Sequence, residues 1–163
     1  MQPLAAPYPV AMIIPLFAAA IVAPAPAGDF DRLATLVGHW QGRTDGGRAV
    51  DIRYTLISNG SALVEEWVSP RGAKTMTVYY RDGAAVLATH FCAQGNQPRL
   101  ALVPTAGPRL RFALRDATNL TPGASHQHDF WIELTPDGSM RRAETYRTGG
   151  ADETETMTLR RVA

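Results

Sequence analysis

The run Val50-Asp51-Ile52-Arg53-Tyr54-Thr55-Leu56 alternates apolar and polar side chains, residue by residue. A second run with the same period places Leu110, Phe112 and Leu114 between arginines. Successive side chains of a β-strand point to opposite faces, so a period of two predicts strands with one buried and one solvated face. These two runs therefore predict a chain built mainly from half-buried β-strands.

Short turn-forming sequences recur on either side of these runs, at intervals of about eight to twelve residues. They are Asp45-Gly46-Gly47, Asn59-Gly60, Arg71-Gly72, Asp82-Gly83, Gln94-Gly95-Asn96, Ala106-Gly107-Pro108, Asp137-Gly138 and Gly149-Gly150. This spacing favours an all-β antiparallel sandwich or a closed up-and-down barrel over strands that alternate with helices. We expect a barrel of about eight to ten strands, because closure removes the exposed edges of a long sheet. Alternation alone leaves the sandwich open.

One short helix is predicted before the first strand. Phe30, Leu33, Leu36 and Val37 recur at helical spacing after an acidic start, and Gly38 is expected to end the helix. The longest gap between turn signals, residues 116–125, is predicted to form a loop at one end of the barrel.

The first 27 residues contain no charged side chain, and Val10 to Val22 form a short apolar run followed by prolines and alanines. This pattern is typical of a secretory signal peptide, and the apolar run is too short for a membrane-spanning helix, which needs about 20 residues. We therefore expect a signal peptide over residues 1–27 and a single barrel domain over 28–163. The protein would be secreted or periplasmic, without membrane insertion of the mature chain. The alternatives for the leader are an uncleaved anchor and a disordered segment.

Sixteen basic and fifteen acidic residues give a net charge of +1, and no basic run stands out. The composition therefore suggests neither nucleic acid nor an anionic membrane surface as a partner, and a charge-neutral ligand fits it better. Cys92 is the single cysteine, so an internal disulfide is excluded. A lone cysteine in an oxidising compartment is either buried or reactive, and we expect Cys92 to be buried.

The motif Gly38-His39-Trp40-Gln41-Gly42, at the start of the first strand, resembles the Gly-x-Trp signature of lipocalins and related calycins. The resemblance implies that the tryptophan closes one end of the barrel. It also implies that a basic residue of the last strand, Arg160 or Arg161, stacks on the indole.

A closer resemblance is to a family of uncharacterised, mostly secreted bacterial proteins with a lipocalin-like domain. It is carried by Gly60 to Glu66, by Thr89 to Arg99 and by Asp116 to Leu120. This resemblance implies the fold and brings no established activity with it.

The Gly-x-Trp-x-Gly form is also similar to nitrobindin-like haem-binding barrels, which implies haem as an alternative cofactor. His126 and His128 are expected to share the inward face of Phe130, because side chains on a strand repeat every two residues. Together with His90 they could bind a transition metal or a haem iron. The alternative is that they only hydrogen-bond the 116–125 loop.

Thr89 to Arg99 concentrates unusual polar chemistry around one turn. Amides at Asn96 and Gln97 could form a polar lid over the barrel, together with Asn119, and Arg99 could recognise a carboxylate. The alternative is that these amides only satisfy backbone groups of their own loop.

Glu65 and Glu66 are neighbours on a predicted strand, so one of them must face inward, and the period leaves both open. A buried carboxylate needs a partner, which we expect to be Arg99 or a histidine. An inward glutamate and His90 could also divide general acid and base work between them.

We therefore expect a secreted, non-enzymatic binding protein that holds a small, partly apolar molecule inside its barrel. The alternatives are a haem or metal barrel that uses His126, His128 or His90, and a small hydrolase or isomerase that uses Glu65 or Glu66 with His90. The candidate ligand-binding residues are Glu65, His90, Asn96, Gln97, Arg99, Asn119, His126 and His128.

Overall fold

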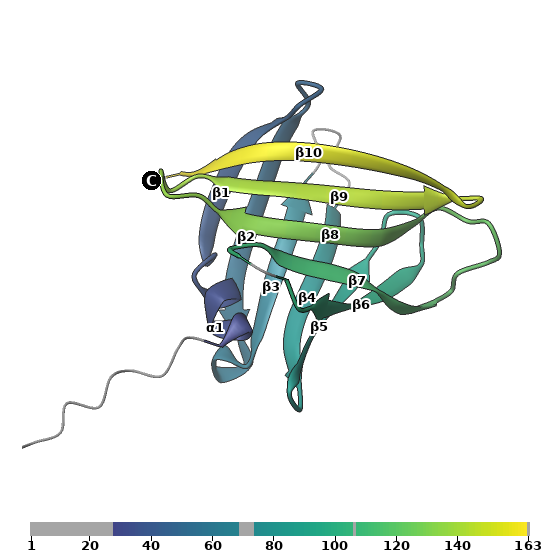
Figure 1. Ribbon diagram of the computed structural model, residues 1–163, viewed down its shortest axis with the longest axis horizontal. Helices are drawn as coiled ribbons and strands as arrows, with labels where there is room; N and C mark the ends of the chain where they lie inside the picture. Colours follow the sequence, from purple (N-terminus) through teal and green to yellow (C-terminus); the bar gives the residue numbers. More distant parts are fainter. Residues whose placement is uncertain (1–27, 69–73, 106, 163) are drawn as a thin grey trace, which may run out of the picture.

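Residues 28–68, 74–105 and 107–162, the parts of the chain that the computed structural model describes, form one short helix and ten strands (Figure 1). The elements are α1 (Asp29–Ala34), β1 (Gly38–Thr44), β2 (Ala49–Ile57), a 3-10 turn (Ser58–Gly60), β3 (Ala62–Val68), β4 (Lys74–Asp82), β5 (Ala85–Phe91), β6 (Gln97–Val103), β7 (Leu110–Thr118), β8 (His126–Leu134), β9 (Met140–Thr148) and β10 (Ala151–Arg161). The expected signal peptide, the turn at Arg71-Gly72 and the first residue of the turn at Ala106 lie outside the described residues.

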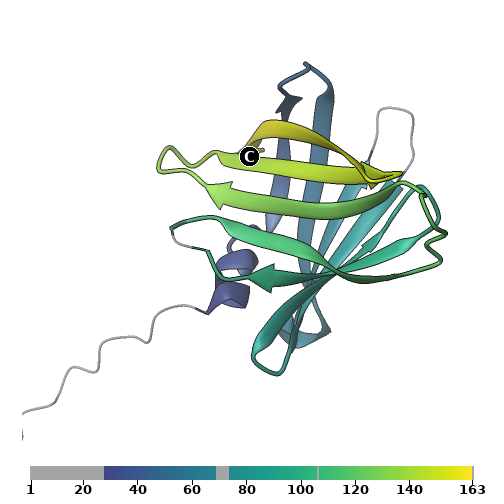
Figure 2. The same ribbon diagram turned by 45° about the vertical axis from the view of Figure 1, so that its right-hand side comes forward.

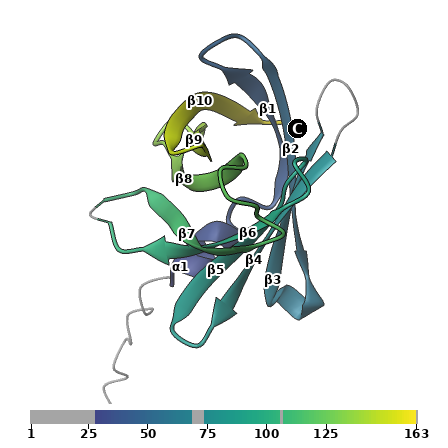
Figure 3. The ribbon, with the colours of Figure 1, turned by 90° about the vertical axis from the view of Figure 1, so that its right-hand side faces the viewer.

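The sheet closes on itself. Each strand pairs antiparallel with the next one along the chain, and β1 also pairs with β10, in a register that joins Trp40 to Arg161 and Thr44 to Met157. In Figure 3, β8 to β10 face β2 to β4 across the interior. Closure confirms the expected up-and-down barrel over the sandwich. Within the described segments, no helix is long and apolar enough to span a membrane.

Helix α1 lies against one end of the barrel (Figure 2), where Phe30 and Leu33 are buried. Trp40 is 1% exposed and donates its indole N–H to the carbonyl oxygen of Leu36 at 2.7 Å. The guanidinium of Arg161 lies over the Trp40 ring, 4.5 Å from its centroid. The expected closure by the tryptophan, and its stacking with a C-terminal arginine, are thus confirmed.

The helix is shorter than the sequence predicted. It ends at Ala34 instead of continuing to Gly38, and Val37 is exposed. The backbone turns after Ala34 because β1 begins at Gly38, where pairing with Tyr54 of β2 starts.

The expected strand faces are confirmed. Val50, Ile52 and Tyr54 of β2 are buried, and so are Leu110 and Phe112 of β7. Cys92 is buried and free, as expected.

The middle of the barrel is aromatic. The rings of Phe112 and Phe130 stack with centroids 4.7 Å apart. The Tyr79 ring meets both edge-on, at 5.6 and 6.1 Å, a geometry favoured between aromatic rings. These rings fill the interior beyond Trp40, so one end of the barrel is a packed apolar core.

Gly42 is required by the closure of the barrel. A Cβ added at this position would lie 2.0 Å from the backbone oxygen of Thr158 and 2.8 Å from Cα of Leu159. We predict that Gly42→Ala lowers the free energy of unfolding by about 3 kcal/mol, because β1 and β10 would have to move apart. Urea unfolding measures this, with Gly46→Ala as the control, since its Cβ would come no closer than 3.8 Å to Thr44 Oγ1. Equal losses in the two variants would contradict the requirement.

Candidate functional site

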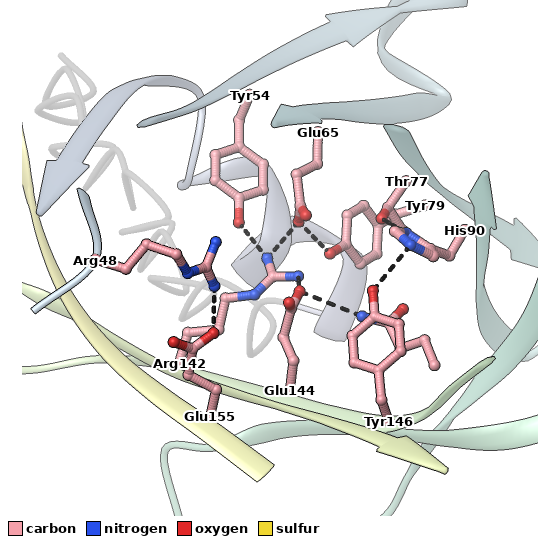
Figure 4. A network of polar contacts seen from close by, with 11 residues as sticks. Arg48, Tyr54, Glu65, Thr77, Tyr79, His90, Arg142, Glu144, Tyr146 and Glu155 are labelled. Carbon is pink, nitrogen blue, oxygen red and sulfur yellow. Dashed lines mark hydrogen bonds and ion pairs between the residues drawn. The ribbon is translucent and has the colours of Figure 1, made fainter. Parts of the chain in front are cut away.

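Arg142 of β9 points into the barrel and is fully buried. Its Nη1 donates to the Glu65 carboxylate at 2.5 Å and to the Tyr54 hydroxyl at 2.9 Å, and its Nη2 donates to the Glu144 carboxylate at 2.6 Å. Figure 4 shows the guanidinium between these groups, which come from β2, β3 and β9. The planar fork of arginine suits this bridging of two carboxylates.

Glu65 is the inward member of the pair left open by the sequence, since Glu66 is exposed. Its carboxylate also accepts the Tyr79 hydroxyl at 2.6 Å. Burial by itself would raise the pKa of Glu65. The charge and hydrogen bonds of Arg142, together with the hydrogen bonds of Tyr79 and Tyr54, bring this pKa below its ordinary value. The expectation that Arg99 or a histidine partners this glutamate is wrong, because Arg142 does so.

Glu144 is the second carboxyl on Arg142, and it also accepts the side-chain N–H of the buried Gln127 at 3.2 Å. Burial raises the pKa of Glu144 above its ordinary value; Arg142 opposes the rise, and the Glu65 charge adds to it. The single charge of Arg142 is thus shared by two carboxyls, and Glu144 is the one that takes up a proton more readily.

His90 is buried beside this network. Its Nδ1 lies 3.0 Å from the Thr77 hydroxyl and its Nε2 lies 3.3 Å from the Tyr146 hydroxyl. Burial lowers the pKa of His90 to about 4; the Glu65 charge opposes this shift, and the Arg142 charge adds to it. The imidazole is therefore neutral at neutral pH, and burial also raises the pKa of the nearby Cys92 thiol.

A cavity of about 650 Å³ opens beyond Glu144, at the end of the barrel away from α1. Its described lining consists of Asp45, Gly46, Arg48, Trp67, Thr75, Ala93, Gln94, Ser125, Glu144, Tyr146, Glu153, Thr154, Glu155 and Thr156. The turns β1–β2 and β5–β6 and the loop before β8 supply its rim, and residues of β3, β4, β9 and β10 supply its walls.

The register of β9 and β10 orders the charges in this cavity. Glu144 lies opposite Glu155, and Tyr146 lies opposite Glu153. Arg48, just before β2, forms an ion pair with Glu155 (Figure 4). Its guanidinium also lies 5.6 Å from the centroid of the Trp67 ring. The two neighbouring glutamates are thus each paired with a different arginine, Glu144 with the buried Arg142 and Glu155 with Arg48 at the mouth.

The two segments of the expected lid lie together at the open end. Asn96 is buried and donates to the carbonyl oxygen of Ser125 at 2.8 Å. The side-chain oxygen of Gln97 accepts from Asn119 at 2.8 Å and from Thr118 at 2.9 Å. Within these segments, Gln94 and Ser125 line the cavity, while Asn96, Gln97 and Asn119 hold the rim together.

Arg99 lies on the outer face of β6 and not in the barrel. It makes a two-pronged pair with Asp116 of β7, at 2.9 and 2.7 Å, and both side chains are about half exposed. The inward face of β6 belongs to Pro98 and Leu100, which are buried. The expected lumenal placement of Arg99 is therefore wrong.

His126 and His128 do not share the face of Phe130. The register of β8 shifts between Gln127 and Asp129, so one extra residue stands in the strand. Gln127 consequently takes the inward position and is fully buried, while both histidines are only partly buried. Among the described residues, no three His, Cys, Asp or Glu side chains gather in a way that could hold a metal ion.

Comparison with known proteins does not name this site. No family model matches the sequence, and no curated protein matches it either. The resemblance to lipocalin-like families stays a prediction.

We predict that Arg142→Met lowers the free energy of unfolding by about 3 to 5 kcal/mol, because two buried carboxyls lose their cation. Urea unfolding at neutral pH measures the loss. Arg141→Met is the matched control, since Arg141 is exposed on the outer face of the same strand. Adding Glu65→Leu to Arg142→Met should restore part of the stability, because it removes a charge that has no counterion. Wild-type stability of Arg142→Met would contradict this account.

A second prediction concerns the stability of the folded protein at acidic pH. The pKa of His90 is about 4 in the folded protein against an ordinary value of 6.5, so between these values only the unfolded chain binds the proton. Its contribution to stability is complete above pH 6.5 and falls by about 3 kcal/mol as the pH drops to about 4. His90→Gln should lack this loss when unfolding is followed from pH 7.5 to 4, whereas His39→Gln, on the outer side of β1, should keep it. A His90→Gln variant with the wild-type pH dependence would refute the assignment.

Proposed function

We propose that this protein is an exported, non-enzymatic binding protein that holds a small molecule at the open end of its barrel. The observation that carries the proposal is the cavity floor, where the Glu144 carboxyl is held by a fully buried arginine. Charged groups are expensive to bury, and well-packed apolar side chains of similar volume are often at least as stabilising. Their presence beneath a cavity is best explained by a need to fix a polar group for a ligand.

The dimensions and lining of the cavity support the same function. Its volume of about 650 Å³ lies in the range of small-molecule sites, roughly 300 to 1,000 Å³. Trp67 supplies an aromatic surface, and Glu144 and Tyr146 supply polar groups whose positions are set by Arg142 and His90. A few fixed polar groups beside an apolar surface are typical of binding pockets.

Export is the part of the proposal that rests on sequence alone. It is supported by the uncharged, apolar residues 1–27.

The haem, metal and hydrolase alternatives find less support in the geometry. None of the expected histidines is among the described residues that line the cavity. Both ring nitrogens of His90 lie within hydrogen-bond distance of hydroxyls, and Glu65 is closed off by Arg142 and Tyr79. The residues present therefore do not fit a haem iron, and we assign no step to one.

A fragment screen by ¹H–¹⁵N NMR on the full-length protein tests the binding function. The chain has three tryptophans, and ligands should shift the indole N–H of Trp67 in the cavity without shifting that of Trp131 on the outer side of β8. Glu144→Gln should weaken the ligands found by about tenfold, the equivalent of one well-placed polar contact. Glu66→Gln, an exposed control, should leave affinity unchanged. Ligands that shift Trp131 alone, or that ignore Glu144→Gln, would contradict the proposed site.

A further inference from the structure

The cavity is strongly acidic although the chain as a whole is nearly neutral. Of its described lining residues, Asp45, Glu144, Glu153 and Glu155 carry carboxyl groups, and Arg48 alone carries a fixed positive charge. Glu153 and Glu155 share the inward face of β10 with the buried Met157 and Leu159, so they face the interior. Fields inside a cleft with low-dielectric walls are focused, which makes this local excess of negative charge effective toward a ligand.

Arg48 shows which chemical group these walls accommodate. Its side chain is 46% exposed at the mouth, yet its guanidinium reaches in to pair with Glu155 and to lie over the Trp67 ring. A flexible cationic side chain of the protein thus occupies a place between a carboxylate and an aromatic surface. That combination attracts organic cations, through ion pairing on one side and the negative face of the ring on the other.

An anionic ligand fits this cavity poorly. The terminal nitrogens of Arg142 already donate to Glu65, Tyr54 and Glu144, and its Nε, which has no partner among the described residues, is buried. The charge of this guanidinium is therefore already balanced by two carboxyls. A ligand carboxylate would meet Arg48 alone among the described lining residues, and it would meet the repulsion of the glutamates as well.

We propose that the cavity binds a small organic cation, an amine or guanidine with an apolar portion, that takes the place of the Arg48 guanidinium between Glu155 and Trp67. This inference rests on the proposed binding function and names its ligand class. It replaces the charge-neutral ligand that the composition favoured, because net charge averages over the whole surface and says nothing of one cavity.

The environment of Glu144 supports the proposal. The charged and titratable groups around it are Arg142 and Tyr146 on its own strand, Glu65 on β3, Tyr54 on β2, Arg48 before β2, Glu155 on β10 and Cys92 after β5. Burial raises the pKa of Glu144 despite Arg142, so its ionised form lacks sufficient positive charge nearby. A bound cation would supply that charge and favour loss of the proton, so binding and proton release are linked.

Three probes of one shape and different charge test the ligand class on the full-length protein: 2-phenylethylamine, 2-phenylethanol and phenylacetate. We expect the amine to bind at least about tenfold more tightly than the other two at pH 7 by calorimetry. It should shift the Trp67 indole, and its affinity should fall with added salt because charge attraction is screened. Calorimetry at mildly acidic pH in two buffers of different ionisation enthalpy should show proton release that Glu144→Gln abolishes.

Substitutions of basic and acidic residues in the cavity should change the affinity for the amine in opposite directions. Arg48→Ala should strengthen the amine by about three- to tenfold, since it removes both a competitor and a like charge, whereas Glu155→Gln and Glu153→Gln should weaken it by a similar factor. Glu66→Gln on the outer face should change nothing. All four side chains are at least partly exposed, so these substitutions test binding without emptying the core.

The outcomes separate the two proposals. Tighter binding of the alcohol or the acid at Trp67, or loss of amine binding in Arg48→Ala, would overturn the cation assignment and leave the binding function standing. If none of the three probes shifts Trp67, the cation assignment fails, and the binding function fails with it only when the fragment screen also yields no ligand at Trp67.

Discussion

The interior of this barrel depends on how one buried guanidinium is neutralised. Arg142 holds Glu65 from β3 and Glu144 from its own strand, and its contact with Tyr54 adds β2. Glu65 lies on β3 and Arg142 on β9, strands that face each other across the interior (Figure 3), so their pair joins two walls of the barrel that share no backbone hydrogen bonds. Charged groups in a low-dielectric interior tolerate little misplacement, because any unpaired charge is costly. The network therefore separates two regions: the packed apolar end around Trp40, and the cavity above Glu144.

The architecture could be predicted because its signals are local. Alternation in β2 and β7 depends only on neighbouring residues, and glycine-containing turns mark the ends of strands. The closure by Trp40 followed from a motif and from the position of Arg161 at the end of the chain. The inward face of β9 was hidden, since Met140, Arg142, Glu144 and Tyr146 mix one apolar residue with two charged ones. Pattern methods treat charge as a mark of solvent, so a strand with buried ions gives no clear face.

The site was harder to predict because it depends on contacts between distant strands. Polar residues are dense near the 89–99 turn, and Asn96 and Gln97 do lie at the rim, but the charged residues of the cavity come mainly from β9, β10 and the turn before β2. A single bulge in β8 moved Gln127 inward and both histidines aside, and nothing in the histidine spacing marks an inserted residue. Arg99 of β6 pairs with Asp116 of β7 on the outer face of the barrel, and this contact follows only from the register of the two strands.

The order of charges along the interior carries the functional argument one step further. Glu144 and Glu155 stand opposite each other on β9 and β10, an arrangement that is unfavourable for two like charges unless each has a cation of its own. Arg142 forms an ion pair with Glu144 from the closed side of the barrel, and Arg48 forms one with Glu155 from the mouth. The two cations differ in one physical respect: Arg142 is fully buried and fixed, whereas Arg48 is about half exposed and reaches in from the rim. Exchange of the outer cation for one from solution would leave a positive charge beside Glu155 and would leave Arg142 in place, so the fold can exchange a ligand at its mouth while its core stays in place.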